Sequence, residues 1–140
     1  MRGTYVMILH VPYDIALSVG ELGRVDFGAG YYAYVGSALG GLEGRIGRHL
    51  GREKKIHWHI DHLMLHARAV DVVLAESEER KECEIAARLA EDLKMVRGFG
   101  SSDCRCLSHL FYHQNRNSLT EAVVRAFREA GLRPRSGLHE

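Results

Sequence analysis

Several features are scarce in this chain of 140 residues, and each scarcity excludes a class of protein. The three cysteines are too few and too odd in number for a disulfide framework, which fits a reducing compartment. No apolar run approaches the roughly 20 residues of a membrane helix, and no signal-peptide cleavage site follows the short apolar start. The formal net charge is only +1, so bulk electrostatics would not hold the chain on nucleic acid. We therefore expect a cytoplasmic protein with no membrane segment.

The composition is that of an ordinary globular domain, with 46% hydrophobic and 26% charged residues. The length supports one core, so we expect a single domain over residues 1–132 and a loose tail over residues 133–140. β-Branched and apolar runs predict strands, and apolar residues at helical spacing predict helices. The predicted strands are residues 4–11, shorter strands within 13–30, then 31–36, 69–75 and 107–113. The predicted helices are 42–52, 58–66, 79–97 and a last one that Ser118-Leu119-Thr120-Glu121 opens as a capping box and Gly131 closes. The fold class is therefore α/β (α+β), with a small mixed, mainly antiparallel sheet flanked by helices.

Positive charge gathers on the predicted helix over residues 42–52 and just after it. Between residues 43 and 55, two glutamates stand against five basic residues, Arg45, Arg48, Arg52, Lys54 and Lys55. At about 100° per residue, Arg45 and Arg52 nearly eclipse each other, so one helix face carries a stripe of guanidinium groups. The arginine fork suits phosphate because it donates two parallel hydrogen bonds. A solvated helix face is the alternative explanation.

One glutamate of the long helix predicted over residues 79–97 falls inside its apolar stripe. Glu82 precedes Ile85 by three positions and Leu89 by seven, whereas Glu84 is turned toward Arg88. A buried carboxylate without a partner is costly, so such a group pairs, binds a metal or lies in a cleft. The alternative is that Glu82 reaches solvent at the first turn of the helix.

The nine histidines and three cysteines raise the question of zinc. Cys104-Arg105-Cys106, with His109 nearby, is a weak match, because zinc sites take four ligands and their cysteine pairs usually have about two to four residues between them, whereas only Arg105 lies between these two. We therefore do not expect zinc, and we interpret Cys83 as a small core residue.

The order of these motifs resembles the GIY-YIG nuclease superfamily. Gly3-Thr4-Tyr5 lies on the first strand and Tyr34-Val35-Gly36 on a later one, followed by Arg45 and His49 four residues apart and then by the Glu82 helix. The segment from Tyr34 to His49 is similar to the nuclease region of the nucleotide excision repair subunit that makes the 3′ incision. The chain resembles still more closely an archaeal-type domain of unknown function that is sometimes fused to an endonuclease III-like glycosylase. Its marks here are residues 55–61 and 98–110.

The chain departs from that superfamily at two places. The tyrosines of the two triplets are separated by 28 residues rather than roughly ten, which an inserted hairpin within residues 13–30 would explain at about 1 kcal/mol of closure entropy. Glu78 and Glu79 also stand where the family tends to have apolar residues, so Glu82 could be displaced from the family position.

The resemblance implies metal-dependent hydrolysis of phosphodiester bonds, with DNA as the favoured substrate and DNA repair proteins as associates. Glu82 would hold Mg²⁺ or Mn²⁺, and Arg45 would clamp the scissile phosphate. Tyr5 would position or deprotonate the attacking water, with Tyr34 and His49 beside it. The residues expected to bind the nucleic-acid backbone are Arg48, Arg52, Lys54 and Lys55.

Tyrosine has an ordinary pKa of about 10, so Arg45 and the metal would have to lower the pKa of Tyr5, or His49 would take the proton instead. Two alternatives differ in class from an enzyme. One is a nucleic-acid-binding module that keeps the fold without cleavage. The other is a regulatory protein stabilised by zinc through Cys104, Cys106 and the histidines.

Overall fold

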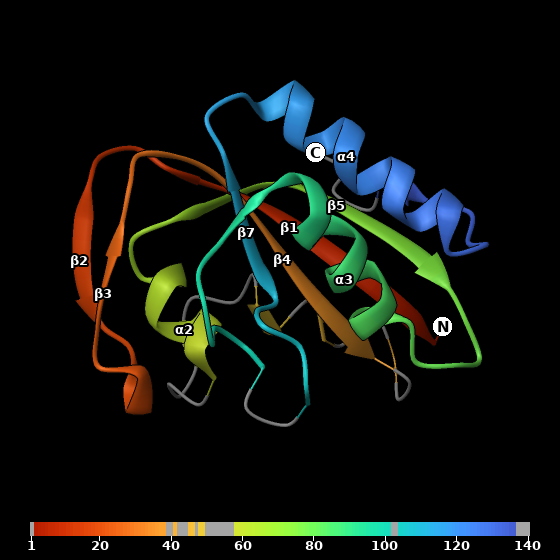
Figure 1. Ribbon diagram of the computed structural model, residues 1–140, viewed down its shortest axis with the longest axis horizontal. Coiled ribbons are helices and arrows are strands. Elements are labelled where there is room, and N and C mark those ends of the chain that lie inside the picture. Colours follow the sequence, from red (N-terminus) through yellow and green to blue (C-terminus); the bar gives the residue numbers. More distant parts are fainter. Residues whose placement is uncertain are drawn as a thin grey trace.

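A six-stranded sheet forms the centre of the computed structural model (Figure 1). The structure describes residues 2–38, 41, 45–46, 48–49, 58–101 and 104–136. The strand order is β6-β7-β4-β1-β5-β8, and each neighbouring pair is antiparallel. The strands are β1 (Gly3–Val11), β4 (Gly30–Ala38), β5 (Arg68–Glu76), β6 (Lys94–Met95), β7 (Leu110–His113) and β8 (Arg135–Ser136). The predicted class, a mainly antiparallel sheet flanked by helices, is confirmed.

Strand β1 lies between β4 and β5 and is buried on both faces. Tyr5, Met7 and Leu9 point into one core, whereas Val6 and Ile8 point into a second core on the opposite side. A strand that is covered on both faces needs apolar residues at every position, so the sequence shows a continuous apolar run rather than an alternation.

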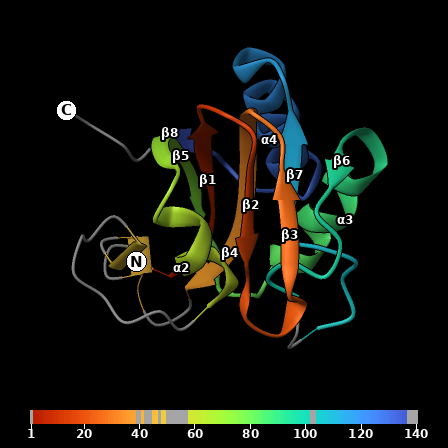
Figure 2. The same cartoon turned by 90° about the vertical axis from the view of Figure 1, so that its left-hand side faces the viewer.

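The sheet is the middle of three layers. One face is covered by helices α3 (Glu82–Asp92) and α4 (Arg116–Glu129), which lie in front of the sheet in Figure 1. The other face is covered by helix α2 (His59–Met64) and the hairpin of β2 (Ile15–Ser18) and β3 (Arg24–Phe27), which lie in front in Figure 2. Leu89 and Phe127 are fully buried on the first side, and Phe27 and Leu63 on the second.

The β2–β3 hairpin confirms the short strands predicted within residues 13–30. A turn of 3-10 helix over Gly20–Leu22 joins its two strands. Gly23 follows with φ of 72°, a left-handed conformation that favours glycine. The fully buried Val19 and Phe27 attach the hairpin to the core, so the long separation between the two tyrosine triplets is accommodated as a packed element.

The helix predicted over residues 79–97 is shorter in the structure. Helix α3 ends at Asp92, and Lys94 and Met95 then pair with β7 as strand β6. Leu93 and Val96 still pack against the two cores, but both lie beyond the last residue of the helix. The helical spacing of the apolar residues therefore predicted correctly which residues are buried, but it predicted a helix that is too long.

The last helix begins earlier than the predicted capping box. The side chain of Asn115 accepts a hydrogen bond of 2.9 Å from the backbone N–H of Ser118, so α4 starts at Arg116. Gly131, with φ of 81°, ends the helix as predicted. Arg135 and Ser136, in the segment for which a loose tail was expected, pair with β5 as β8. Among the described helices, none is long and apolar enough to cross a membrane.

Candidate functional site

A cleft of about 390 Å³ opens near the start of β1, the end of β4 and the first turn of α3. Its walls come from segments that are far apart in the sequence. The lining residues are Tyr5, Tyr34, Val35, Gly36, Ser37, Arg45, Trp58, His59, Arg80, Glu82, Gly100, Cys104 and His109. The structure thus brings four of the predicted site residues, Tyr5, Tyr34, Arg45 and Glu82, to one cavity.

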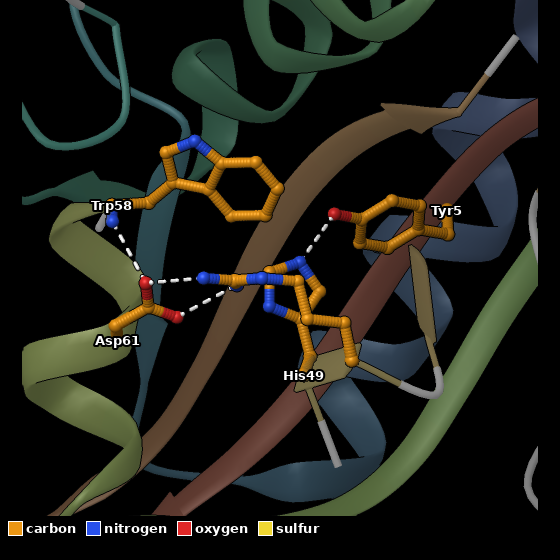
Figure 3. Close-up of polar contacts among 5 residues, drawn as sticks. Tyr5, His49, Trp58 and Asp61 are labelled. Carbon is orange, nitrogen blue, oxygen red and sulfur yellow. Dashed lines mark hydrogen bonds and ion pairs between the residues drawn. The ribbon is translucent and has the colours of Figure 1, made fainter. Parts of the chain in front are cut away.

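The pairing of β1 with β4 explains the two glycine–tyrosine triplets. Tyr5 lies directly opposite Gly36, and a Cβ atom at Gly36 would overlap the Tyr5 ring. The missing side chain therefore allows the phenol ring to lie across β4. The Tyr5 hydroxyl reaches Nε2 of His49 at 2.7 Å (Figure 3). The buried His49 ring also packs edge-on against Tyr34 at 5.9 Å, so the fifth predicted site residue joins the same group.

Burial keeps both tyrosines of the cleft protonated at neutral pH. It raises the pKa of Tyr5 far above its ordinary value, and the neighbouring Tyr34 adds to the rise. It also raises the pKa of Tyr34 to about 12. Arg45 acts in the opposite direction on Tyr5 but with a smaller effect. Burial outweighs the guanidinium, so Arg45 by itself does not bring the pKa of Tyr5 below its ordinary value, and transfer of the proton to His49 stays a prediction.

Arg48 forms an ion pair with a residue that the sequence analysis did not single out. Its two terminal nitrogens each donate to Asp61 at 3.0 Å, and the Asp61 carboxylate is fully buried. This hydrogen bonding raises the pKa of Arg48. The backbone N–H of Trp58 donates to the same carboxylate at 2.8 Å, as Figure 3 shows. Arg48 therefore joins its helical segment to the start of α2, and the phosphate contact expected of it stays a prediction.

Trp58 holds two guanidinium groups against its indole ring. The Arg45 carbon Cζ lies 4.6 Å from the ring centroid, and the Arg48 carbon Cζ lies 4.2 Å from it. Cation–π contacts of this kind are worth about 0.5–2 kcal/mol and orient the planar fork. Arg45 thus lines the cleft with its guanidinium packed on Trp58, and the ion pair of Arg48 with Asp61 holds the same helical segment against α2.

Helix α3 directs Glu82 and Glu84 to different surroundings, as their helical phase predicted. The Glu82 side chain is 13% exposed, lines the cleft and lies 3.8 Å from the Arg80 guanidinium. The Glu84 side chain is 40% exposed and lies 3.6 Å from Arg88. The predicted inward direction of Glu82 is confirmed, and the alternative of a solvent-facing first turn is not.

A second group of potential ligands lies at the wall of the same cleft. The side chains of Cys83, Cys104, Cys106 and His109 place one ligand atom each within 4.8 Å of one another. Burial raises the pKa of the Cys83 and Cys106 thiols. The interpretation of Cys83 as a core residue is therefore corrected, and the donor set suits zinc rather than Mg²⁺. The sequence did not predict this four-residue cluster, because Cys104 and Cys106 lie in one segment with His109 whereas Cys83 lies on a helix that is distant in the sequence.

Three predicted binding residues, Arg52, Lys54 and Lys55, lie outside the described residues, as do parts of the predicted helix over 42–52. Arg45, Ile46, Arg48 and His49 are helical, as predicted. Trp58 and Asp61 lie in the segment 55–61 that carries the family resemblance, but neither was predicted to belong to the site. Their signal was available, since Trp58 is the only tryptophan and Asp61 follows it at the three-residue spacing of a helix start.

Comparison with known proteins gives one family and no closer relative. No curated protein matches the chain, and no solved structure matches it. The family described as a domain of unknown function, DUF123, matches residues 4–132, which run from the second residue of β1 through α4 and include every residue of the cleft. On this match, the chain belongs to the DUF123 family.

Proposed function

We propose that this chain is a metal-dependent nuclease of the GIY-YIG type that hydrolyses phosphodiester bonds in nucleic acid, with DNA as the favoured substrate. One observation carries the proposal: Tyr5, Tyr34, Arg45 and Glu82 come from four segments and line a single cleft. Two proton-handling groups, a guanidinium and a carboxylate are the groups that phosphoryl chemistry requires in one place.

The cleft fits a hard divalent cation. The Glu82 oxygen Oε2 is buried and has no hydrogen-bond partner among the described residues, and the same is true of the Ser37 hydroxyl in the cleft wall. Mg²⁺ is commonly held by one or two carboxylates together with waters and substrate phosphate oxygens. Glu82 would hold the ion, which when bound stabilises the charge that develops on the phosphate and the leaving oxygen.

Arg45 binds a non-bridging oxygen of the scissile phosphate in this proposal. A guanidinium donates parallel hydrogen bonds to phosphate and stays charged at every physiological pH. Contact with Trp58 restricts its orientation before substrate arrives, which reduces the entropy lost on binding. Arg52, Lys54 and Lys55 are proposed to bind the nucleic-acid backbone away from the scissile bond.

In this proposal Tyr5 does not act as a phenolate base but relays a proton from the attacking water to His49. The 2.7 Å hydrogen bond lets the Tyr5 hydroxyl pass its proton to Nε2 of His49 while its oxygen accepts a proton from the attacking water. The water oxygen bonds to phosphorus, the bond from phosphorus to the 3′ oxygen breaks, and that oxygen takes a proton from solvent. His49 then releases the proton that it took to solvent and regains its starting state. Tyr5 stays neutral throughout, which agrees with its raised pKa. The products would carry 5′-phosphate.

The test compares Glu82→Gln with Glu84→Gln, which remove the same charge from the same helix turn. Cleavage of single-stranded, flap, branched and damaged duplex DNA is measured with Mg²⁺ or Mn²⁺, and binding is measured by fluorescence anisotropy. We expect Glu82→Gln to lose at least about 100-fold in cleavage rate while it still binds, and Glu84→Gln to remain active. Identical purification of both variants controls for contaminating nucleases.

Two results would contradict the proposal. If the unaltered chain cleaves none of these substrates with either metal but still binds them, it is a binding module on this fold. If cleavage survives in Glu82→Gln and is lost in Glu84→Gln, the carboxylate assigned to the metal is the wrong one.

A further inference from the structure

We propose that Cys83, Cys104, Cys106 and His109 bind one zinc ion that fastens the chain before β7 to the first turn of α3. Its donors are sulfur and nitrogen, whereas the proposed Mg²⁺ position uses the carboxylate oxygen of Glu82. The zinc site is defined by the geometry of four side chains from two distant parts of the sequence.

The distances between the ligand atoms are close to those of a tetrahedral zinc site. With Zn–S near 2.3 Å and Zn–N near 2.05 Å, tetrahedral geometry requires about 3.6 Å between sulfur and nitrogen and about 3.8 Å between sulfurs. The Sγ of Cys104 lies 3.4 Å from Nε2 of His109, and the Sγ of Cys83 lies 4.0 Å from it. All four ligand atoms lie within 4.8 Å of one another. Shifts of less than about 1 Å would therefore complete the coordination.

The backbone holds the histidine in position. The His109 N–H donates to the Phe99 carbonyl at 2.8 Å, and the Val35 N–H donates to the His109 carbonyl at 2.9 Å. The ring nitrogen Nε2 lies 3.4 Å from the Sγ of Cys104 and 4.0 Å from the Sγ of Cys83, so it faces the thiols. Zinc would therefore meet one ligand whose main chain is already held in place.

The number and softness of the ligands identify the metal. Thiolate and imidazole donors favour zinc over Mg²⁺ or Ca²⁺, and four protein ligands make a closed structural site with no position for substrate. A disulfide would use only two of the three thiols and would leave one thiol and the imidazole without a role. The four residues together are explained by one ion.

The site would stabilise one wall of the cleft. Cys83 is adjacent to Glu82, and both Cys104 and His109 line the cleft. Zinc would thus hold the start of α3, with its inward-facing carboxylate, against the chain that enters β7. In this arrangement the zinc ligands act as positioning residues.

The experiment measures metal in the purified full chain by inductively coupled plasma mass spectrometry. We expect about one zinc per chain after dialysis, and loss of most of it in Cys83→Ser and in Cys106→Ser. Neither variant alters the Glu82 side chain. The matched control is His66→Gln, which replaces an exposed histidine and should leave the zinc content unchanged.

A second measurement avoids variants that fail to fold. Zinc is removed from the unaltered chain with a chelator and Co²⁺ is added back, which should produce thiolate-to-cobalt charge transfer and tetrahedral d–d absorption that saturate near one equivalent. A chain that is purified from zinc-supplemented culture without zinc, and that gives no such absorption, would overturn the proposal. So would zinc retained in both cysteine variants, or a thiol count that shows a disulfide before reduction.

Failure of this proposal is distinguishable from failure of the proposed nuclease. Metal content and cobalt absorption are measured without nucleic acid, so they do not depend on whether the cleft cleaves anything.

Discussion

Removal of either partner from the Arg48–Asp61 pair should destabilise the fold, and by unequal amounts. Arg48→Met would leave a fully buried carboxylate without this counter-charge, although the Trp58 N–H would still donate to it at 2.8 Å. Breaking a buried pair in this way costs about 3–5 kcal/mol. Asp61→Asn would leave a guanidinium that is 29% exposed and still packed on the Trp58 ring at 4.2 Å. Its loss should be about 1.5–3 kcal/mol, the range for hydrogen bonds to charged groups.

Urea unfolding at neutral pH measures both losses, and a thermal scan gives a second measure. At about 3–4 °C per kcal/mol for a domain of this size, Arg48→Met should lower the Tm by about 9–20 °C. The double variant with Asp61→Asn should lose at least about 1 kcal/mol less than the sum of the single losses, because the two residues share one interaction. The exposed pair of Arg24 and Asp26, with side chains 77% and 78% exposed, is the matched control. Asp26→Asn should cost no more than about 1 kcal/mol.

Three results would refute this reasoning. Additive losses in the double-variant cycle would mean that Arg48 and Asp61 do not stabilise each other in the folded chain. Equal losses in Asp26→Asn and Asp61→Asn would mean that burial does not set the energy of the pair. A larger loss in Asp61→Asn than in Arg48→Met would reverse the predicted order.

Two further predictions concern single positions. Gly36→Ala should lower the free energy of unfolding by about 1–3 kcal/mol, measured in urea, because the new Cβ overlaps the Tyr5 ring. Gly28→Ala is the control and should be nearly neutral, because a Cβ there has nothing nearer than 4.0 Å. Similar losses in both variants would show that the ring can move aside. Burial lowers the pKa of His59, whose neutral Nδ1 accepts from the Gly100 N–H at 2.9 Å. The stability that this provides is fully present above the ordinary histidine pKa of about 6.5 and is lost as the pH falls below it. Between about pH 7.5 and about pH 5, the unaltered chain should therefore lose more unfolding free energy than His59→Gln, and equal losses would contradict the assignment.

The secondary structure was predicted best where the local pattern and the tertiary environment agree. The apolar run of β1 and the aromatic run of β4 predicted strands because both are buried along nearly their whole length. The end of α3 was placed too late, because the spacing of Leu93 and Val96 matches a helix although both residues lie beyond its last residue. The pairing of Lys94 and Met95 with β7 is a long-range interaction that periodicity does not contain.

The candidate site divides in the same way. The inward direction of Glu82 followed from helical phase alone, because Ile85 and Leu89 define the buried face of one continuous helix. The ion pair between Arg48 and Asp61 could not be predicted from the sequence, since it depends on how the segment that carries Arg48 packs against α2.

The sequence by itself determined the fold class, the order of the main elements and the face on which Glu82 lies, because these depend on neighbours within a few positions. Tertiary structure alone decided the protonated state of Tyr5, its hydrogen bond with His49 44 positions away, and the gathering of Cys83 with Cys104, Cys106 and His109. The physical reason is that burial, the pKa of a buried group and metal-ligand geometry depend on residues that are distant in sequence and become neighbours only when the sheet has formed.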